Sequence, residues 1–216
     1  MMKFSGSFFG AWNDGRWQSN NLDSDLRALG LNTVDKVDKI WDFNFGIGGP
    51  IFRDKLWFYG SARHWGVHEG KTGTFDVPSG ANVIQCSTGA IACAQGIDDQ
   101  QIKSAVVRLT WQASPRNKIS AYFDEIDKFR GHGFTTGNVT DSLTASQIWT
   151  SPLYNDAVLK WTSTLSSQLL VEAGFSMNYE QYVIVNQDGI NQERGTPGWY
   201  ACSARWRASR IPRCIS

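Results

Sequence analysis

Four cysteines are the residues of this sequence with the most distinctive chemistry, and they form two local pairs. Cys86 and Cys93 make the first pair, and Cys202 and Cys214 make the second. Zinc is a poor fit, because neither pair has the C-x2-C spacing and no histidine lies close in sequence to either pair. Short-range pairs in regions without a strand pattern are typical of disulfides in an oxidising compartment. We therefore expect two disulfides, with free thiols as the alternative.

Other metal, phosphate or catalytic sites find little support in the spacing of the polar residues. His64 and His68 would share a metal on a helix, but they fall at the end of a strand pattern, which places them at a rim or in a loop. The acidic clusters at 23–25 and 98–99 lack the ligand array that calcium needs. The glycines of 46–49 are not followed by the Lys-Ser/Thr of a phosphate loop. No Ser-His-Asp or Cys-His group has supporting context, so we expect no enzyme, no catalytic residue, no metal and no cofactor.

Charged residues on the non-aromatic side of alternating segments form the remaining candidate site. Those expected to face a lumen or a solvated surface are Asp42, Arg63, Arg108, Lys160 and Glu172. They could line a substrate path, but ion pairs with one another or contacts to a plug domain are the preferred interpretation. A turn at 50–55 brings Asp42 nearly opposite Arg63, a pairing worth roughly 0.2–1 kcal/mol. A turn near Ser166 sets Lys160 opposite Glu172 in the same way.

The segments that position these charges alternate large apolar and polar residues with a period of two, which predicts β-strands. We expect strands near residues 3–12, 41–47, 56–63, 104–112, 119–124, 157–162 and 169–178. Short loops of about four to six residues join the last six of these into three antiparallel hairpins. The sequence therefore predicts an all-β fold, an antiparallel up-and-down meander.

The connections between the hairpins are predicted to be long, polar and without strands. They cover residues 13–36, with a helical turn near 26–29, then 66–100, and then 128–151 with a strand stub at 147–150. Connections of this length are unusual in a compact soluble domain. Short turns on one rim and long loops on the other are typical of outer-membrane β-barrels, whose long loops are extracellular.

The composition limits the class of protein and the kind of partner. The chain has 216 residues, a net charge of +1 and no Lys/Arg run, so we expect no nucleic-acid partner. It contains 10 Trp, 12 Phe, 6 Tyr and 21 Gly, a mixture that suits barrels with aromatic girdles. No run of about 18 apolar residues predicts a transmembrane helix. The first residues carry no secretory signal, so we expect the natural N-terminus to lie upstream and the chain to be a fragment.

Two kinds of β protein fit the alternation. In a soluble sandwich the apolar face packs on a second sheet, and in an outer-membrane barrel it meets lipid while the polar face meets a wet lumen. Sorting of charges to one face suits both, whereas the segregation of short and long loops favours the barrel. Trp41, Trp111 and Trp161 lie on the apolar face, so contact with lipid or a girdle position is preferred to sugar stacking.

Three hairpin motifs closely resemble TonB-dependent outer-membrane receptors, in particular the Oar-like group that joins a carboxypeptidase-regulatory-like domain to a plug and barrel. The first motif is DFNFGIGGPI at 42–51 with DKLWFYGS at 54–61 and Arg63, which is similar to the early-hairpin signature GGPI-x-x-DKLWFF-x-S-x-R. RLTWQ at 108–112 with NKIS at 117–120 looks like the next hairpin. LKWT at 159–162 with LVEAGF at 170–175 looks like the one after it.

The resemblance implies a barrel of about 22 strands, closed by a plug, that takes up a bulky ligand with the help of an inner-membrane energy-coupling complex. It implies that residues 1–185 form part of the barrel, about seven strands, and that 186–216 resemble a truncated extracellular loop. The implied partners are outer-membrane lipid, the TonB complex acting through a plug region missing here, and an unidentified extracellular ligand. The alternatives are a soluble glycan-binding module and a small complete outer-membrane barrel or adhesin.

Overall fold

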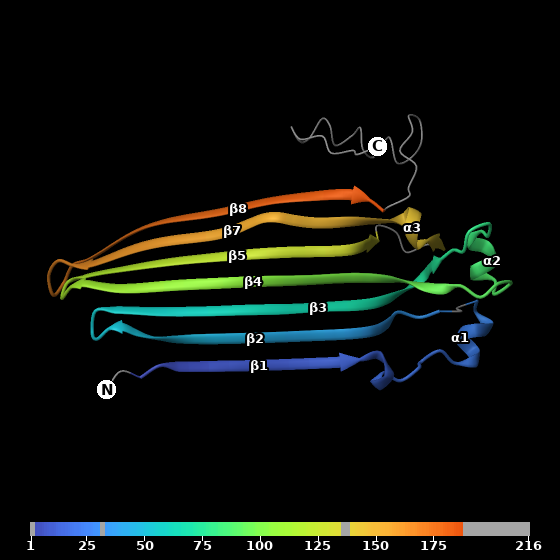
Figure 1. Cartoon of the computed structure of the whole chain (residues 1–216), viewed down its shortest axis with the longest axis horizontal. Coiled ribbons are helices and arrows are strands. Elements are labelled where there is room, and N and C mark those ends of the chain that lie inside the picture. The colour runs from blue at the N-terminus through green and yellow to red at the C-terminus, as the bar shows by residue number, and fades with distance from the viewer. Residues whose placement is uncertain (1–2, 31–32, 135–138, 188–216) are drawn as a thin grey trace, which may run out of the picture.

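The chain folds into one antiparallel sheet, described by a computed structural model for residues 3–30, 33–134 and 139–187. The strands follow the order β1-β2-β3-β4-β5-β7-β8, so each pairs with its neighbour along the path (Figure 1). Their bounds are β1 Ser5–Asp14, β2 Lys36–Phe52, β3 Leu56–Asp76, β4 Ala94–Ser114, β5 Asn117–Phe134, β7 Ser146–Thr164 and β8 Leu170–Asn186. A two-residue strand, β6 (Thr140–Asp141), pairs in parallel with β3. The predicted all-β antiparallel meander is confirmed.

Tight turns gather at one end of the sheet and short helices at the other (Figure 1). The helices are η1 (Gly15–Trp17), α1 (Ser24–Ala28), α2 (Val83–Ser87) and α3 (Ser142–Ala145). Side chains cap them: Asp23 accepts a hydrogen bond from the backbone N–H of Leu26, and Asn82 forms a capping box with Gln85 at α2. In the part of the chain that the structure describes, no helix is long and apolar enough to cross a membrane.

The predicted long connections at 66–100 and 128–151 are wrong, because the strands on either side continue through most of them. β3 runs on to Asp76 and β4 already begins at Ala94, while β5 ends at Phe134 and β7 begins at Ser146. The expected stub at 147–150 is therefore the first part of β7. Backbone hydrogen bonds between strands do not depend on apolar side chains, so a strand can continue where both of its faces are polar. Such a stretch lacks the alternation of apolar and polar residues by which the turn-side halves of these strands were predicted.

The sheet has no covering layer, and its large apolar side chains remain exposed. Among the described residues only Phe75 and Cys86 are buried hydrophobics. Phe43 and Leu109 are 42% and 40% exposed, respectively, although both lie in the middle of paired strands. The described strands provide no second sheet for a sandwich core. The sheet is also not closed, since β1 pairs only with β2 and β8 only with β7.

Candidate functional site: an apolar band and a polar face

The ladder register assigns every strand residue to one of two faces, because direct partners across an antiparallel ladder point to the same side. One rung of partners defines the aromatic face and reads Phe58, Leu109, Ala121, Leu159 and Phe175 from β3 to β8. The opposite side, which holds Asp42 and Arg63, is called the polar face. The sequence alternation thus produces two continuous surfaces that run across all seven long strands.

Two rungs of the aromatic face carry tryptophans, one toward each end of the sheet. Trp12 and Trp41 are direct partners toward the helix end of the sheet, and Trp111 and Trp161 share a rung close to the turns. The rung of Trp41 reaches β4 at Gln101, so the ten residues from 101 to 111 separate the two tryptophan rungs. At ~3.4 Å per residue this is ~34 Å along the strand. A strand tilted by about 35–45° would convert that length into a height of about 24–28 Å.

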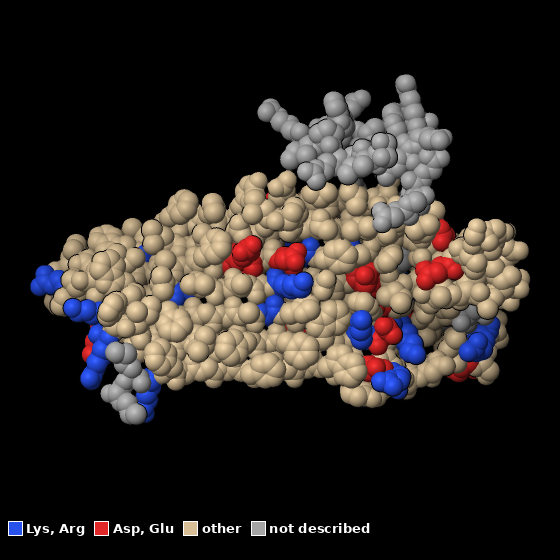
Figure 2. Space-filling view, in the orientation of Figure 1, with Lys and Arg blue, Asp and Glu red and all other residues tan. Residues whose placement is uncertain are grey.

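The apolar side chains of the aromatic face between these tryptophan rungs form what we call the apolar band; Lys103, Glu125 and Asp127 lie beyond its limit toward the helix end. Its larger members are Phe8, Phe43, Phe45, Ile47, Val107, Leu109, Phe123, Leu159, Phe175 and Met177, all exposed. On the side of the molecule seen in Figure 2, acidic and basic residues are mixed from the middle of the sheet to the helix end, whereas the turn-side half is mostly uncharged apart from a cluster at its tip. A large exposed apolar surface of this kind marks contact with lipid or protein.

The limit of the apolar band runs obliquely across the strands. Counted from the turn end, the first charged residue on the aromatic face of β2 is Lys39. Its rung passes through His68 and reaches β4 at Asp99. On β5 the first charged residue is Glu125, whose rung reaches β4 at Ala105. These two rungs are six residues apart on β4, from 99 to 105, which is ~20 Å along the strand. In a barrel wall the strands tilt, so a boundary parallel to the membrane crosses neighbouring strands at different rungs of the ladder. The oblique limit observed here has this form.

The polar face brings four of the five predicted lumen residues together as two ion pairs. Arg63 Nη2 lies 2.7 Å from Asp42 Oδ2, and Lys160 Nζ lies 2.8 Å from Glu172 Oε1. Both pairs are diagonal, because the register sets Asn44, not Asp42, directly opposite Arg63. Likewise Lys160 faces Gly174 and Thr162 faces Glu172.

Arg108 is the one predicted lumen residue that the structure leaves outside these pairs. It lies exposed on the polar face, with Tyr59 and Tyr122 as its ladder partners. It makes no ion pair with any residue of the described ranges. Its charge therefore remains available on this surface.

A pair of carboxylates on the polar face was missed by sequence reasoning. Asp124 of β5 and Asp156 of β7 are direct ladder partners. The Tyr122 hydroxyl donates to Asp124 Oδ2 over 3.2 Å, and the Asn178 amide donates to Asp156 Oδ1. The other oxygen, Asp124 Oδ1, is buried without a hydrogen-bond partner among the described residues. The register between β5 and β7 brings these two residues together, and these strands are not joined by a tight turn, so no local pattern could have identified the pair.

The helix end of the sheet holds most of the buried polar residues, Ser163 near the turns being an exception. Cys86 and Cys93 are joined by a disulfide in the connection that contains α2, whereas Cys202 and Cys214 lie outside the described residues. Arg130 forms a bidentate ion pair with Asp98, whose side chain is 7% exposed. These contacts hold the distal parts of β4 and β5 together where no apolar core exists.

The residues considered for metal binding have other partners. Asp98 pairs with Arg130, and Asp99 Oδ1 lies 2.7 Å from His132 Nδ1. His64 and His68 lie within β3, not in a loop, and both contact the Trp41 ring edge-on. Within the described ranges no group of three His, Cys, Asp or Glu side chains is placed to hold a metal ion.

One acidic group outside the strands has a perturbed pKa. Partial burial of Asp35 raises the pKa of its carboxyl, but the backbone N–H of Thr72, 2.7 Å away, and the Lys71 ammonium outweigh burial and hold that pKa below its usual value. Asp35 therefore ties the segment before β2 to the end of β3 in its charged form.

Beyond this geometry, other proteins provide no guide to the site. Comparison of the chain with protein-family models, with curated proteins and with solved structures finds no match.

Proposed function

We propose that this chain is a segment of the wall of an outer-membrane β-barrel of the TonB-dependent receptor type. The observation that carries the proposal is the spacing of the tryptophan rungs on the aromatic face. Their separation of ~34 Å along a strand corresponds to a height near the ~25 Å of a lipid-facing band when strands tilt as they do in such barrels. Aromatic girdles at both limits of the band are the expected arrangement at the two interfaces.

Burial in lipid also accounts for an exposed apolar surface that no protein layer covers. Phe43 and Leu109 would face hydrocarbon, which removes their apolar area from water as a protein core would. In lipid an open sheet edge is not tolerated, because unpaired N–H and C=O groups have no water to bond. The free edges of β1 and β8 would accordingly be paired by further strands of a closed barrel.

The orientation follows from the two ends of the sheet. Short turns face the periplasm in such barrels and longer connections face outward. The extension of β3 and β4 beyond the apolar band, with the Cys86–Cys93 disulfide at its tip, would then lie outside the cell, in an oxidising environment. This outer part is the portion of the segment that would meet the ligand first.

The polar face would line the lumen, where the Asp42–Arg63 and Lys160–Glu172 pairs can remain solvated. In a receptor of this type the lumen is filled by a plug, and uptake of a bulky ligand is driven through that plug by the inner-membrane energy-coupling complex. The hairpin motifs at 42–63, 108–120 and 159–175 support this finer part of the proposal by their resemblance to the receptor family. Ligand capture and passage are therefore the activity that we propose for the whole barrel.

Folding of the full chain with and without lipid tests the membrane part of the proposal. We expect strand-type circular dichroism and a heat-dependent gel mobility only when detergent micelles or vesicles are present. A monodisperse monomer that folds in plain buffer would overturn the proposal. The coding sequence on either side tests the receptor part, which requires a plug domain upstream and about fifteen further strands downstream.

A further inference from the structure

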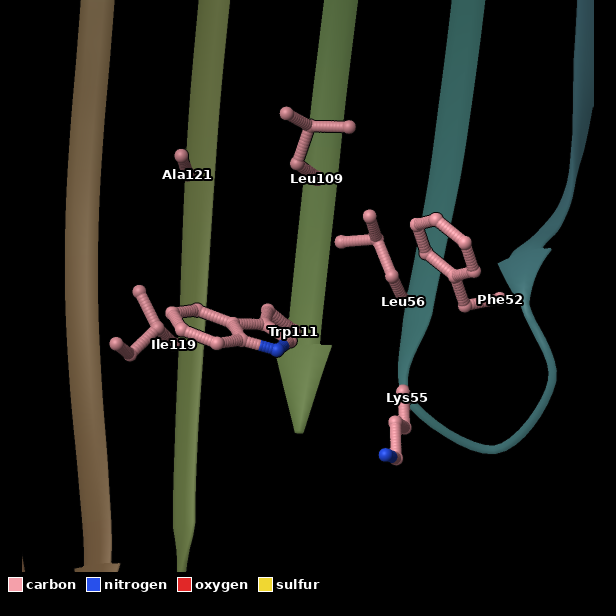
Figure 3. Close-up of a pocket in the computed structure, with 7 residues that line it drawn as sticks. All are labelled: Phe52, Lys55, Leu56, Leu109, Trp111, Ile119 and Ala121. Atoms are coloured by element: carbon pink, nitrogen blue, oxygen red, sulfur yellow. The ribbon is translucent and has the colours of Figure 1, made fainter. Parts of the chain in front are cut away.

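A groove opens on the aromatic face close to the turns, and one cation stands at its end. The groove has a volume of about 470 Å³, within the range of small-ligand sites. Phe52 and Leu56 form one side, Trp111 and Ile119 form the other, and the small side chain of Ala121 leaves room between the strands (Figure 3).

Lys55 is the only charged residue that lines this groove, and it lies at the turn end of it (Figure 3). Its side chain is exposed and makes no ion pair with any residue of the described ranges. Its carbonyl accepts a hydrogen bond from the backbone N–H of Gln112 over 2.7 Å, which fixes the β2–β3 turn against β4. The Lys55 ammonium therefore lies at the end of an apolar groove and has no acidic partner among the described residues.

The neighbouring turns add positive charge to the same rim. Arg53 lies in the β2–β3 turn with Asp54, 3.4 Å away, as its partner. Arg116 lies exposed in the β4–β5 turn with no ion pair among the described residues. The turn between β7 and β8, residues 165–169, contains no charged residue. The β2–β3 and β4–β5 turns, which adjoin the groove, therefore carry more positive charge than the β7–β8 turn.

We infer that this groove binds an anionic phospholipid of the leaflet that surrounds the turns, and this inference rests on the proposed function. One acyl chain lies along the groove between Leu56 and Trp111, and the phosphate lies at Lys55 with Arg116 nearby. An apolar channel selects for an acyl chain, and a cation at the headgroup level attracts a net negative headgroup more than a zwitterionic one. The Trp111 indole lies at the level where tryptophan meets the interface.

Native mass spectrometry of the full chain in detergent, with phosphatidylglycerol and phosphatidylcholine at equal concentration, tests the inference. We expect phosphatidylglycerol to dominate the lipid adducts of the wild-type chain. Lys55→Gln should lower the apparent affinity for phosphatidylglycerol roughly fivefold and leave that for phosphatidylcholine unchanged. Ala121→Trp, which fills the groove, should lower binding of both lipids.

Lys103→Gln is the matched control, because it removes a cation from the same face and strand ladder but far from the turns. It should leave the lipid preference unchanged, and millimolar glycerol phosphate should not displace the bound lipid. Equal binding of the two lipids, or equal losses in the Lys55 and Lys103 variants, overturns the inference while leaving the proposed membrane location intact. A chain that folds in plain buffer and carries no lipid overturns both.

Discussion

Asp124 and Asp156 face each other directly across the β5–β7 ladder, so two carboxylates share one rung of the polar face. Like charges placed directly opposite destabilise a sheet, and among the described residues only the Tyr122 hydroxyl and the Asn178 amide donate hydrogen bonds to these two carboxylates. The ion pairs elsewhere on this face have the opposite effect. The Asp124–Asp156 rung therefore lies between two attractive diagonals, one on β2–β3 and one on β7–β8.

Removal of one of these charges should stabilise the sheet. We expect Asp156→Asn to raise the free energy of unfolding by about 0.2–1 kcal/mol at neutral pH, because the repulsion between the carboxylates disappears. Urea titration of the chain in detergent, followed by circular dichroism, measures the change. Asp42→Asn is the control and should act in the other direction, since it breaks the pair with Arg63. A loss of stability in Asp156→Asn would mean that the rung is not repulsive.

Arginine substitutions on adjacent residues of β4 should separate the two faces. Leu109 lies in the apolar band and Thr110 lies on the polar face, where Trp57 and Ser120 are its partners. An arginine that faces lipid at mid-depth costs about 2–4 kcal/mol, so Leu109→Arg should block assembly into membranes and Thr110→Arg should be tolerated. Heat-dependent gel mobility after folding into vesicles provides the measurement. Equal effects of the two substitutions would contradict the assignment of the faces.

Loss of the disulfide should loosen the α2 connection and spare the ladders. The bridge closes a short loop, with a sequence separation of 7 between Cys86 and Cys93. Its removal should cost about 2–3 kcal/mol locally, on the chain-entropy estimate for a loop of this size. Hydrogen exchange of the Cys86→Ser/Cys93→Ser chain should therefore accelerate in 83–87 but not in the centre of β4. Uniform acceleration along β4 would show that the disulfide supports the whole sheet.

Acid should release the segment that precedes β2. The folded-state pKa of Asp35 is lowered, so its contribution is complete above the unfolded value of about 3.9 and is lost as the pH falls through the folded value. We expect protection of the Thr72 amide, corrected for intrinsic exchange rates, to stay constant above about pH 4 and to fall as the pH drops further. The Asp35→Asn chain lacks the titrating carboxyl and should show no such step. A step of the same size in both chains would assign it to another group.

The turn-side half of the fold could be predicted from the sequence because its two faces differ in hydropathy. Phe43 and Phe45 next to Asp42 and Asn44 produce a clear period of two, and the hairpin loops follow from it. The far halves of β3 and β4 carry polar residues such as Glu69 on both faces, so the alternation disappears although the hydrogen-bonded ladder continues. The alternation of hydropathy depends on one face of a strand being apolar, so it does not identify the parts of a strand whose two faces are both polar.

The candidate site was predictable to the same extent. The alternation of side chains along a strand assigns Arg63 and Lys160 to the polar face. Counting back from the hairpin turns placed their acidic partners directly opposite them, and the structure places these partners one diagonal position away. The facing carboxylates could not be found in this way, because β6 and α3 separate β5 from β7 and no tight turn between these strands sets their register.

The free edges of β1 and β8 have a consequence for any copy of this segment that is separated from its proper neighbours. Each edge strand presents a row of backbone N–H and C=O groups that no described strand pairs with. The edge strand of a second copy of this sheet can pair with them. Addition of one copy to the next would be heterologous, and the curvature of the sheet would decide between a closed ring and an open ribbon. Such a segment would act as a seed for self-assembly, and a closed wall of the kind proposed would suppress this because it leaves no free edge.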